Sequence, residues 1–390
     1  MMKVFQINVD CGCYSTGKIA SDLAKSLEKE GAESIVAYGR EYKETGIKSY
    51  KIGNKFDIYY HFAMSKLFDD VGLHSCFVTK KLIKRIINYN PDIIHLHNLH
   101  GYYINYKILF EFLKKYSKPV VWTLHDCWPF TGHCAYFDYC GCNKWKNECS
   151  KCQQLKTYPS SYLKDNSKNN YYLKKKLFSS LDNLIIVTPS EWLANLIKES
   201  FLNDKVVRVI HNGIDTDIFF PCPTNIYKEK YGIKSKIILG VATPWSERKG
   251  LKDFIKLSRK LNKEYSIFLV GLSKKQIQLL PDNVYGIEKT LDVHELIELY
   301  SSADVFLNLT YEDNYPTTNI EAQACGTPVI SYKTGGSIES CVESQIVEKG
   351  DIEALSKMIL KENLVIKSDL KISKMDMLKS YIELYKSINI

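Results

Sequence analysis

The chain has 390 residues, of which 45% are hydrophobic and 25% are charged. These proportions are typical of packed soluble proteins and exclude disordered and fibrous classes. At roughly 100–200 residues per domain, the length predicts two domains. Lysine and arginine total 53 against 44 acidic residues, and the net charge of +9 favours anionic partners such as nucleotide phosphates, an anionic membrane surface or nucleic acid.

The beginning of the chain is predicted to be a β-strand. Residues 1–10, MMKVFQINVD, alternate apolar and polar side chains and lack the long apolar core of a signal peptide. No run along the chain approaches the ~20 apolar residues of a bilayer span. We therefore expect a cytoplasmic location, and in a reducing compartment the 12 cysteines favour thiols or a metal site over disulfides.

Short apolar runs alternate with helical stretches, the first of which is predicted over Ile19–Glu30. Strands are predicted over Val4–Val9, Ser34–Tyr38, Asp92–Leu96, Val120–Leu124, Leu184–Val187, Val206–Ile210, Ile237–Val241, Ser266–Val270, Asn283–Ile287, Val305–Leu309 and Pro328–Ser331. Nearly continuous apolar strands are typical of parallel sheets with helices on both faces. The fold class is therefore α/β.

The alternation is interrupted at residues 211–223, HNGIDTDIFFPCP, by an Asn-Gly turn signal and two prolines. We expect one domain over residues 1–210, a hinge over 211–223 and a second domain over 224–370. Both domains are predicted to be doubly wound and Rossmann-like. Ligands of such sheets bind beyond the carboxyl ends of the strands, which predicts a site in a cleft between the domains. A final helix over 371–390 could pack back on the first domain.

A glycine-containing turn, Asp10–Lys18 (DCGCYSTGK), connects the first strand to the first helix. Glycine lets the backbone approach a ligand closely, and helix N-termini bind anions, so Gly17 is a candidate anion-binding residue. The alternative is an ordinary turn with Ser15 or Thr16 as the N-cap.

Histidines end two later strands of the first domain. His125 and Asp126 follow one strand, and His95, His97 and His100 (HLHNLH) end or follow another. These positions lie at the edge of the sheet where ligands are expected, and the HLHNLH residues could line a ligand pocket. A structural role in the core is the alternative for each histidine.

Six cysteines lie between Cys127 and Cys152, within a loop predicted over residues 126–160. The spacing C-x7-C-x6-C-x2-C includes a C-x2-C half that is common in four-thiolate zinc sites, and it predicts a structural zinc bound by Cys134, Cys142, Cys149 and Cys152. Reduced thiols without metal and a disulfide are the alternatives, and His133 competes as a ligand.

The run Tyr311–Pro328, YEDNYPTTNIEAQACGTP, follows an apolar strand and leads into a short helix that begins near Thr317. The N–H groups of Thr317, Thr318 and Asn319 would form a diphosphate site at the helix N-terminus. Glu321 lies one turn further on and could accept hydrogen bonds from ribose hydroxyls.

This run resembles the E-x7-E signature of retaining glycosyltransferases of family 4, which adopt the GT-B fold. Asp313 occupies the first acidic position, with Glu312 beside it, and Glu321 occupies the second within EAQACGTPV. The similarity extends over nearly the whole chain and is greatest to transferases of capsule and colanic-acid type, which have His-Asp-Cys-Trp and Gly-His-Cys elements.

Two further elements resemble the same family. Lys249-Gly250 matches the loop in which the family places a Lys and an Arg beside the donor diphosphate. The family's Arg position is occupied by Thr243 and Pro244, so Arg248 could supply that charge. Residues 212–215, Asn-Gly-Ile-Asp, resemble the family's interdomain element, and their place in the hinge argues against a metal-binding D-x-D at residues 215–217.

The resemblance implies a retaining, metal-independent transfer of a hexosyl-type unit from a nucleoside diphosphate sugar to a sugar hydroxyl of a surface polysaccharide. His125 and Asp313 would face the donor sugar, Lys249 would balance the charge of the leaving diphosphate, and Gly17 would contact the donor. Residues 1–210 would form the acceptor-side domain, in which His95, His97 and His100 could line the acceptor pocket, and residues 224–370 would form the donor domain. A GT-B epimerase or phosphorylase, and a non-catalytic protein that binds sugar nucleotides or nucleic acid, are the alternatives.

Basic runs at Lys80–Arg85 and Lys174–Lys176 lie among Tyr and Phe residues. A solvated helix face is one interpretation. The other is docking to an anionic membrane surface, at the inner face of the membrane, which would suit a lipid-pyrophosphate acceptor. The sequence does not indicate the donor base, the donor sugar, the acceptor or the oligomeric state.

Overall fold

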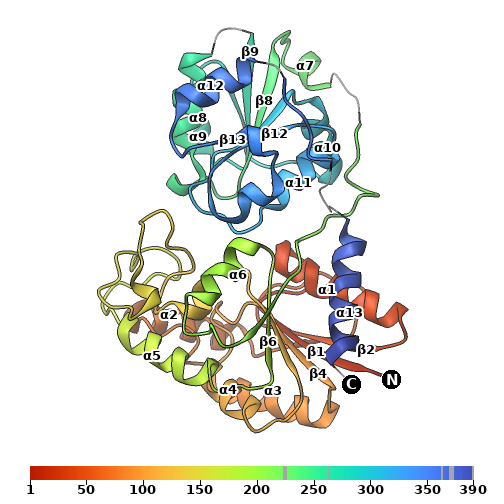
Figure 1. Cartoon of the computed structure of the whole chain (residues 1–390), viewed down its shortest axis with the longest axis vertical. Helices are drawn as coiled ribbons and strands as arrows, with labels where there is room; N and C mark the ends of the chain where they lie inside the picture. The colour runs from red at the N-terminus through yellow and green to blue at the C-terminus, as the bar shows by residue number, and fades with distance from the viewer. Residues whose placement is uncertain (223–225, 262–263, 362, 369–372, 389–390) are drawn as a thin grey trace. The chain divides into compact units, whose positions relative to one another are not determined.

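The computed structural model describes residues 1–222, 226–261, 264–361, 363–368 and 373–388 (Figure 1). The chain forms two compact units. Unit 1 contains Met1–Ile210 together with the chain from Leu378 onward, and unit 2 contains His211–Met377. The predicted boundaries at 223/224 and 370/371 lie outside the described residues.

Unit 1 is built on a parallel sheet of seven strands in the order β3-β2-β1-β4-β5-β6-β7. The strands are β1 (Lys3–Asn8), β2 (Glu33–Tyr38), β3 (Ser49–Lys51), β4 (Ile93–Leu96), β5 (Val120–Thr123), β6 (Leu184–Thr188) and β7 (Val206–Val209). The helices are α1 (Tyr14–Lys29), α2 (Lys55–Phe68), α3 (Cys76–Tyr89), α4 (Tyr106–Leu113), α5 (Ser167–Phe178) and α6 (Glu191–Lys198).

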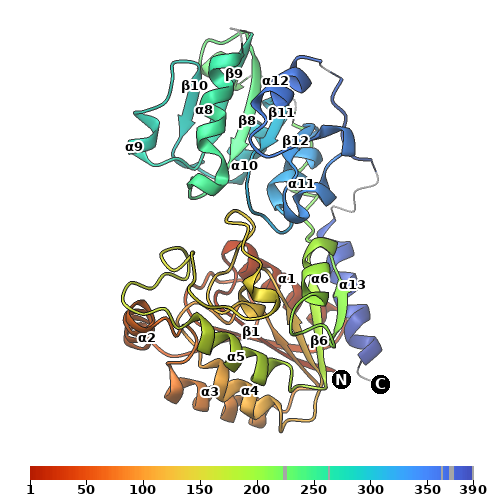
Figure 2. The ribbon, with the colours of Figure 1, turned by 60° about the vertical axis from the view of Figure 1, so that its left-hand side comes forward.

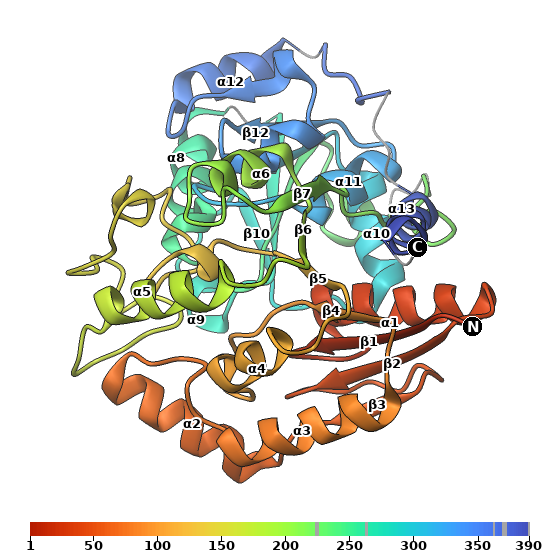
Figure 3. The same ribbon diagram turned by 60° about the horizontal axis from the view of Figure 1, so that its bottom comes forward.

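Helices cover both faces of this sheet (Figure 3). The apolar sides of α3, α4 and α5 pack against one face, in the cluster that contains Phe5 and Ile7 of β1. Ala20 and Ala24 of α1 pack against Val36 of β2 on the opposite face. Every residue of β4 and β5 is buried, because both faces of these central strands are covered.

Unit 2 repeats this architecture with six parallel strands in the order β10-β9-β8-β11-β12-β13 (Figure 2). The strands are β8 (Lys236–Val241), β9 (Tyr265–Val270), β10 (Val284–Ile287), β11 (Val305–Asn308), β12 (Val329–Tyr332) and β13 (Ile346–Val347). The helices are α7 (Ile226–Lys230), α8 (Leu251–Lys260), α9 (Lys274–Ile277), α10 (Val293–Ser302), α11 (Thr317–Ala324) and α12 (Ile352–Leu360).

The order of each sheet reverses beside its first strand. β1 lies between β2 and β4, and β8 lies between β9 and β11. The connections that leave neighbouring strands at such a point diverge to opposite faces, and ligands of doubly wound sheets bind there, beyond the carboxyl ends of the strands. The loops after β1 and β4 and the loops after β8 and β11 are therefore the positions to examine for a site.

The predicted α/β fold with two doubly wound domains is confirmed, and each predicted strand has a counterpart. Two short edge strands, β3 and β13, were not predicted, because segments of three and two residues carry too little alternation to be recognised. The prediction of Ser15 or Thr16 as the N-cap is wrong: Cys13 is the N-cap, and both residues lie inside α1.

The final helix, α13 (Lys374–Ile388), belongs to unit 1 from Leu378 onward. Tyr381 and Tyr385 are buried, and their hydroxyls bond Thr123 Oγ1 at 3.1 Å and His95 Nδ1 at 2.5 Å. The helix is therefore attached to strands β4 and β5. Of the helices within the described ranges, none combines the length and hydrophobicity needed to cross a bilayer.

Candidate functional site

In unit 2, the loop after β8 and the loop after β11 are joined by two basic side chains. Lys249 Nζ lies 2.6 Å from Asp313 Oδ2. Arg248 Nη1 donates to the carbonyl of Glu312 at 3.1 Å, and the Arg248 carbonyl accepts from Tyr311 N at 2.7 Å. Both cations thus reach the same segment, although adjacent side chains of the 3-10 turn Glu247–Lys249 (η3) leave the backbone in different directions.

Gly250 makes this arrangement possible. Its φ is 77°, in the left-handed region, and a Cβ at this position would lie 2.2 Å from the Leu309 carbonyl oxygen. Any other residue would push the Lys249 turn away from the end of β11. The close contact with Leu309 therefore explains why a glycine follows Lys249.

Helix α11 begins at Thr317 after Pro316, which offers no side-chain cap. Thr317 and Thr318 are partly exposed at this N-terminus. Asn319 differs from them, because its N–H donates to the Pro316 carbonyl at 3.2 Å. Its side chain is fully buried and bonds residues Asn308, Ser337, Ser340 and Cys341. Asn319 thus orders the helix start, and Thr317 and Thr318 are better placed to meet an anion.

Glu321 is held from α10. The buried Tyr300 hydroxyl donates to Glu321 Oε2 at 3.0 Å, and burial together with this carboxylate raises the pKa of Tyr300 well above its usual value. Tyr300 therefore stays neutral and orients the carboxylate. Sequence reasoning missed Tyr300 because nothing in the sequence links α10 to α11.

The hinge segment is bound to the same part of unit 2. The His211 ring stacks on Tyr315 with centroids 4.8 Å apart, and Asn212 Nδ2 donates to the Tyr315 carbonyl at 3.2 Å. Asp215 is paired with Lys374 at 2.7 Å and accepts from Asp217 N at 3.2 Å. These bonds give Asp215 a role in ordering the hinge turn, which agrees with the interpretation of D-x-D as a structural element.

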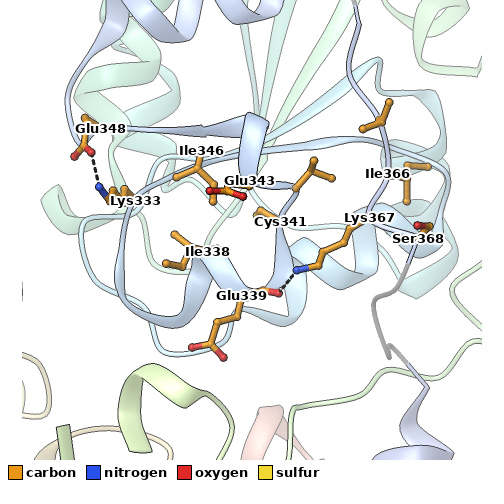
Figure 4. Close-up of a pocket in the computed structure, with 12 residues that line it drawn as sticks. Lys333, Ile338, Glu339, Cys341, Glu343, Ile346, Glu348, Ile366, Lys367 and Ser368 are labelled. Atoms are coloured by element: carbon orange, nitrogen blue, oxygen red, sulfur yellow. Dashed lines mark hydrogen bonds and ion pairs between the residues drawn. The ribbon is translucent and has the colours of Figure 1, made fainter. Parts of the chain in front are cut away.

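Unit 2 also has an open pocket of about 780 Å³ around β13 and residues 365–368 (Figure 4). Lys333 pairs with Glu348 at 2.9 Å across its wall, and Lys367 Nζ donates to the Glu339 carbonyl at 2.9 Å. Its lining contains none of the predicted donor residues. The pocket is therefore separate from the Lys249–Asp313 site.

In unit 1, Gly17 lies in the first turn of α1 and is buried against the end of β1. The Gly17 carbonyl accepts from Gly12 N at 3.0 Å, and a Cβ on Gly17 would lie 3.1–3.2 Å from three atoms of Asp10. Gly17 thus permits the tight turn between β1 and α1. A contact with phosphate stays a prediction.

Three strand ends bring polar groups together in unit 1. Gln6 Nε2 donates to the Ala20 carbonyl and to Ser34 Oγ, which directs Gln6 Oε1 at His97 Nε2, 3.2 Å away. His97 is therefore protonated at Nε2, and its Nδ1 accepts from His125 Nε2 at 3.4 Å. In this network Nε2 of His125 carries the proton and Nδ1 is unprotonated.

The other two histidines are bonded at both ring nitrogens. His100 lies between Asp126 at 2.8 Å and the Tyr158 hydroxyl at 2.9 Å. His95 lies between Thr123 Oγ1 at 2.8 Å and the Tyr385 hydroxyl. His95 is completely buried, so the expectation that it lines an acceptor pocket is wrong, and it belongs to the core.

Burial keeps several imidazoles neutral. Burial, together with a neighbouring histidine, lowers the pKa of His95 and His61 to about 3, and burial lowers the pKa of His125 to about 4. Burial alone would raise the pKa of Asp126, but His100 and the Trp128 N–H outweigh it and lower that pKa. At neutral pH, His125 therefore acts as a polar neutral group and not as a cation.

The lowered histidine pKa values predict that the folded protein becomes less stable in acid. The unfolded chain, whose histidines titrate near pH 6.5, takes up protons between about pH 6.5 and 4 that the native state excludes. The stabilisation that these neutral histidines provide is fully present above pH 6.5. Below that pH, the free energy of unfolding should fall by about 1.4 kcal/mol per pH unit for each such histidine. Urea unfolding at pH 7, 6 and 5 measures the slope.

A matched pair of variants assigns this slope. His95→Asn should reduce the slope of the unfolding free energy against pH by the contribution of one histidine. His294→Asn, at an exposed position of α10, should leave this slope unchanged. A free energy of unfolding that is constant from pH 7 to 5 would contradict the assignment.

The cysteine-rich loop surrounds a small cavity. His133, Cys134, Cys142, Cys149 and Cys152 are among its lining residues. His133 Nδ1 is bonded to the buried Asp69 carboxylate, and among the described residues its buried Nε2 has no hydrogen-bond partner. A carboxylate behind a histidine commonly orients it toward a metal. However, the described parts of the chain hold no group of three or more His, Cys, Asp or Glu placed to bind a metal ion. Structural zinc stays a prediction.

Elemental analysis decides this question. If zinc binds the four cysteines, freshly purified reduced protein should contain about one equivalent, and Cys149→Ser/Cys152→Ser should lose it. Cys222→Ser, at a partly buried cysteine of unit 2, is the matched control and should retain the metal. Reduced wild-type protein without zinc would contradict the prediction.

Comparison with known proteins agrees with this geometry. The family model for Glycosyltransferase Family 4 matches residues 16–218, and the one for Glycosyl transferases group 1 matches residues 224–365. WcaC of Escherichia coli (strain K12), a colanic acid biosynthesis glycosyl transferase by name, is 27% identical over 355 residues, which cover 87% of this chain and 85% of WcaC.

Two solved structures share the fold. Sucrose-phosphate synthase of Thermosynechococcus elongatus has a TM-score of 0.69 at 14% identity, over 99% of both chains. Anabaena HepE in complex with UDP-glucose has a TM-score of 0.65 at 15% identity, over 99% of this chain and 100% of HepE. The first family model spans more than half of the chain, and this protein is therefore a member of glycosyltransferase family 4 with the GT-B fold.

Proposed function

We propose that this protein transfers a sugar, with retention of configuration, from a nucleoside diphosphate sugar to a sugar hydroxyl of a surface polysaccharide. Family membership supports glycosyl transfer, the colanic acid relative supports the polysaccharide, and the neighbour that holds UDP-glucose supports the donor. The observation that carries the proposal is the Lys249–Asp313 pair, at the strand ends where the helix α11 begins.

Lys249 and Arg248 are the groups proposed to meet the donor diphosphate. When the bond between the anomeric carbon and the β-phosphate oxygen breaks, negative charge grows on that phosphate. The Lys249 ammonium, which is paired with Asp313 in this structure, would shift toward the phosphate. The N–H groups of Thr317 and Thr318, at the positive end of the α11 dipole, would also stabilise the phosphate charge. Asp313 would then accept a hydrogen bond from the donor sugar.

The acceptor hydroxyl would attack on the face from which the phosphate departs. Its oxygen forms the new bond to the anomeric carbon, and its proton passes to the leaving phosphate, so no carboxylate nucleophile or divalent metal is required. Neutral His125 would form a hydrogen bond with a sugar hydroxyl. Glu321, oriented by Tyr300, would bind the ribose.

A panel of UDP-, GDP-, ADP- and CDP-sugars tests the donor. The correct class should raise the unfolding temperature by mass action and should then support transfer in the presence of EDTA. Formation of a glycoside distinguishes a transferase from an epimerase or a phosphorylase, and binding without turnover across the panel would favour a non-catalytic protein.

Lys249→Ala tests the central residue. Transfer should fall by about 100-fold or more, because a cation that meets the leaving group acts mainly in the transition state. Lys252→Ala, three residues away on α8 with an exposed side chain, should retain activity. Thermal unfolding checks that both variants fold, and unchanged turnover of folded Lys249→Ala would reject the assignment.

A further inference from the structure

Helix α2 presents its apolar side to solvent. Phe56, Tyr59 and Tyr60 are 85%, 68% and 59% exposed, and Ala63 and Leu67 continue the exposed row. Residues spaced by three and four share one face of a helix, so these side chains form a single stripe. A surface helix normally turns such a stripe toward the core, and in α2 the orientation is reversed.

The buried side of α2 is polar and explains why the helix is held this way. His61 and Ser65 are its buried residues. His61 Nε2 accepts from Gly72 N at 2.9 Å, so its proton is on Nδ1, which lies 2.8 Å from Ser75 Oγ. Turning the apolar stripe inward would carry His61 to the surface, break both bonds and leave the buried N–H of Gly72 without its acceptor.

A loop extends the apolar surface at the end of α2. Tyr162 and Leu163 are 65% and 76% exposed, and Tyr162 N donates to the Lys66 carbonyl at 2.8 Å. Lys66 Nζ lies 5.1 Å from the ring centres of both Phe62 and Tyr162, so it joins loop and helix. We call this surface the α2 patch; it comprises Phe56, Tyr59, Tyr60, Ala63, Leu67, Tyr162 and Leu163.

Positive charge lies on helix α3, which follows α2 and lies next to it (Figure 3). Helix α3 contains no acidic residue, and its Lys80, Lys81, Lys84 and Arg85 are exposed. The one carboxylate on α2, that of Asp57, accepts from Asn54 N in a capping box. The basic run predicted at Lys174–Lys176 does not add to this surface as a unit. Lys174 is buried and donates to the carbonyls of Trp128 and Thr131, so a solvated face is wrong for that residue.

We propose that the α2 patch docks on a lipid bilayer with anionic headgroups. Tyrosine and phenylalanine are favoured at the level of the headgroups, and lysines beside them attract anionic lipids. A second copy of the chain would bring two like-charged borders together, so charge complementarity favours the bilayer over self-association. Docking does not depend on the donor site, although a membrane location would suit a lipid-linked acceptor of the proposed function.

Sedimentation with vesicles measures this docking. Wild-type protein should bind vesicles of phosphatidylcholine with phosphatidylglycerol, and binding should weaken by about tenfold or more when the anionic lipid is omitted or the salt is raised to about 0.5 M. Phe56→Ser/Tyr59→Ser/Leu67→Ser should lose binding by a similar factor. Leu279→Ser/Leu291→Ser, which removes apolar side chains 80% and 92% exposed in unit 2, should bind like wild type.

A fluorescence readout keeps the test independent of the triple variant's folding. Tryptophan introduced by Tyr59→Trp should be quenched by brominated lipid, and tryptophan introduced by Leu279→Trp should not. Absence of wild-type binding, equal binding of the triple variant, or unquenched Tyr59→Trp would overturn the proposal. A wild-type dimer that light scattering detects, and that the triple variant does not form, would also overturn the proposal. Donor binding and turnover in solution are measured separately, so failure of docking leaves the donor assignment intact.

Discussion

The ion pair between Lys249 and Asp313 is the interaction on which the unit 2 site depends. It joins the turn after β8 to the loop after β11, and it exists because Gly250 adopts a left-handed conformation that lets the turn lie against Leu309. The same loop leads directly into the N-terminus of α11. A cation, a carboxylate and a helix start are thus placed together by the reversal of strand order between β8 and β11.

Unit 1 uses the same topology with different chemistry. Its strand ends carry neutral imidazoles, and the tautomer of His97 is set by Gln6, which is buried on β1 and bonded to α1 and β2. Gln6 and Asn8 are the polar members of an alternating strand, and the alternation gave no signal that both side chains would be buried. The neutral imidazoles of unit 1 suit the proposed hydrogen bonds to sugar hydroxyls, and the cations of unit 2 suit the proposed phosphates.

The α2 patch depends on a different constraint. Two hydrogen bonds to His61 fix the rotation of the helix, and the exposed aromatic residues are the consequence. Composition alone would place an aromatic helix in the core. The structure instead gives this helix a polar buried side, which is why its exposed surface suggests a partner outside the chain.

The sequence by itself determined the fold class, the two domains and the identity of the family, because apolar alternation, the break near Asn212 and the run from Asp313 to Glu321 are local patterns. It also placed Lys249, Asp313 and His125 at strand ends, since parallel strands share one carboxyl edge. Only the tertiary structure decided that Arg248 faces the same segment as Lys249, that Tyr300 holds Glu321 and that Lys174 is buried. Those relations join residues far apart in the chain, and they arise from packing and backbone turns that no local pattern records.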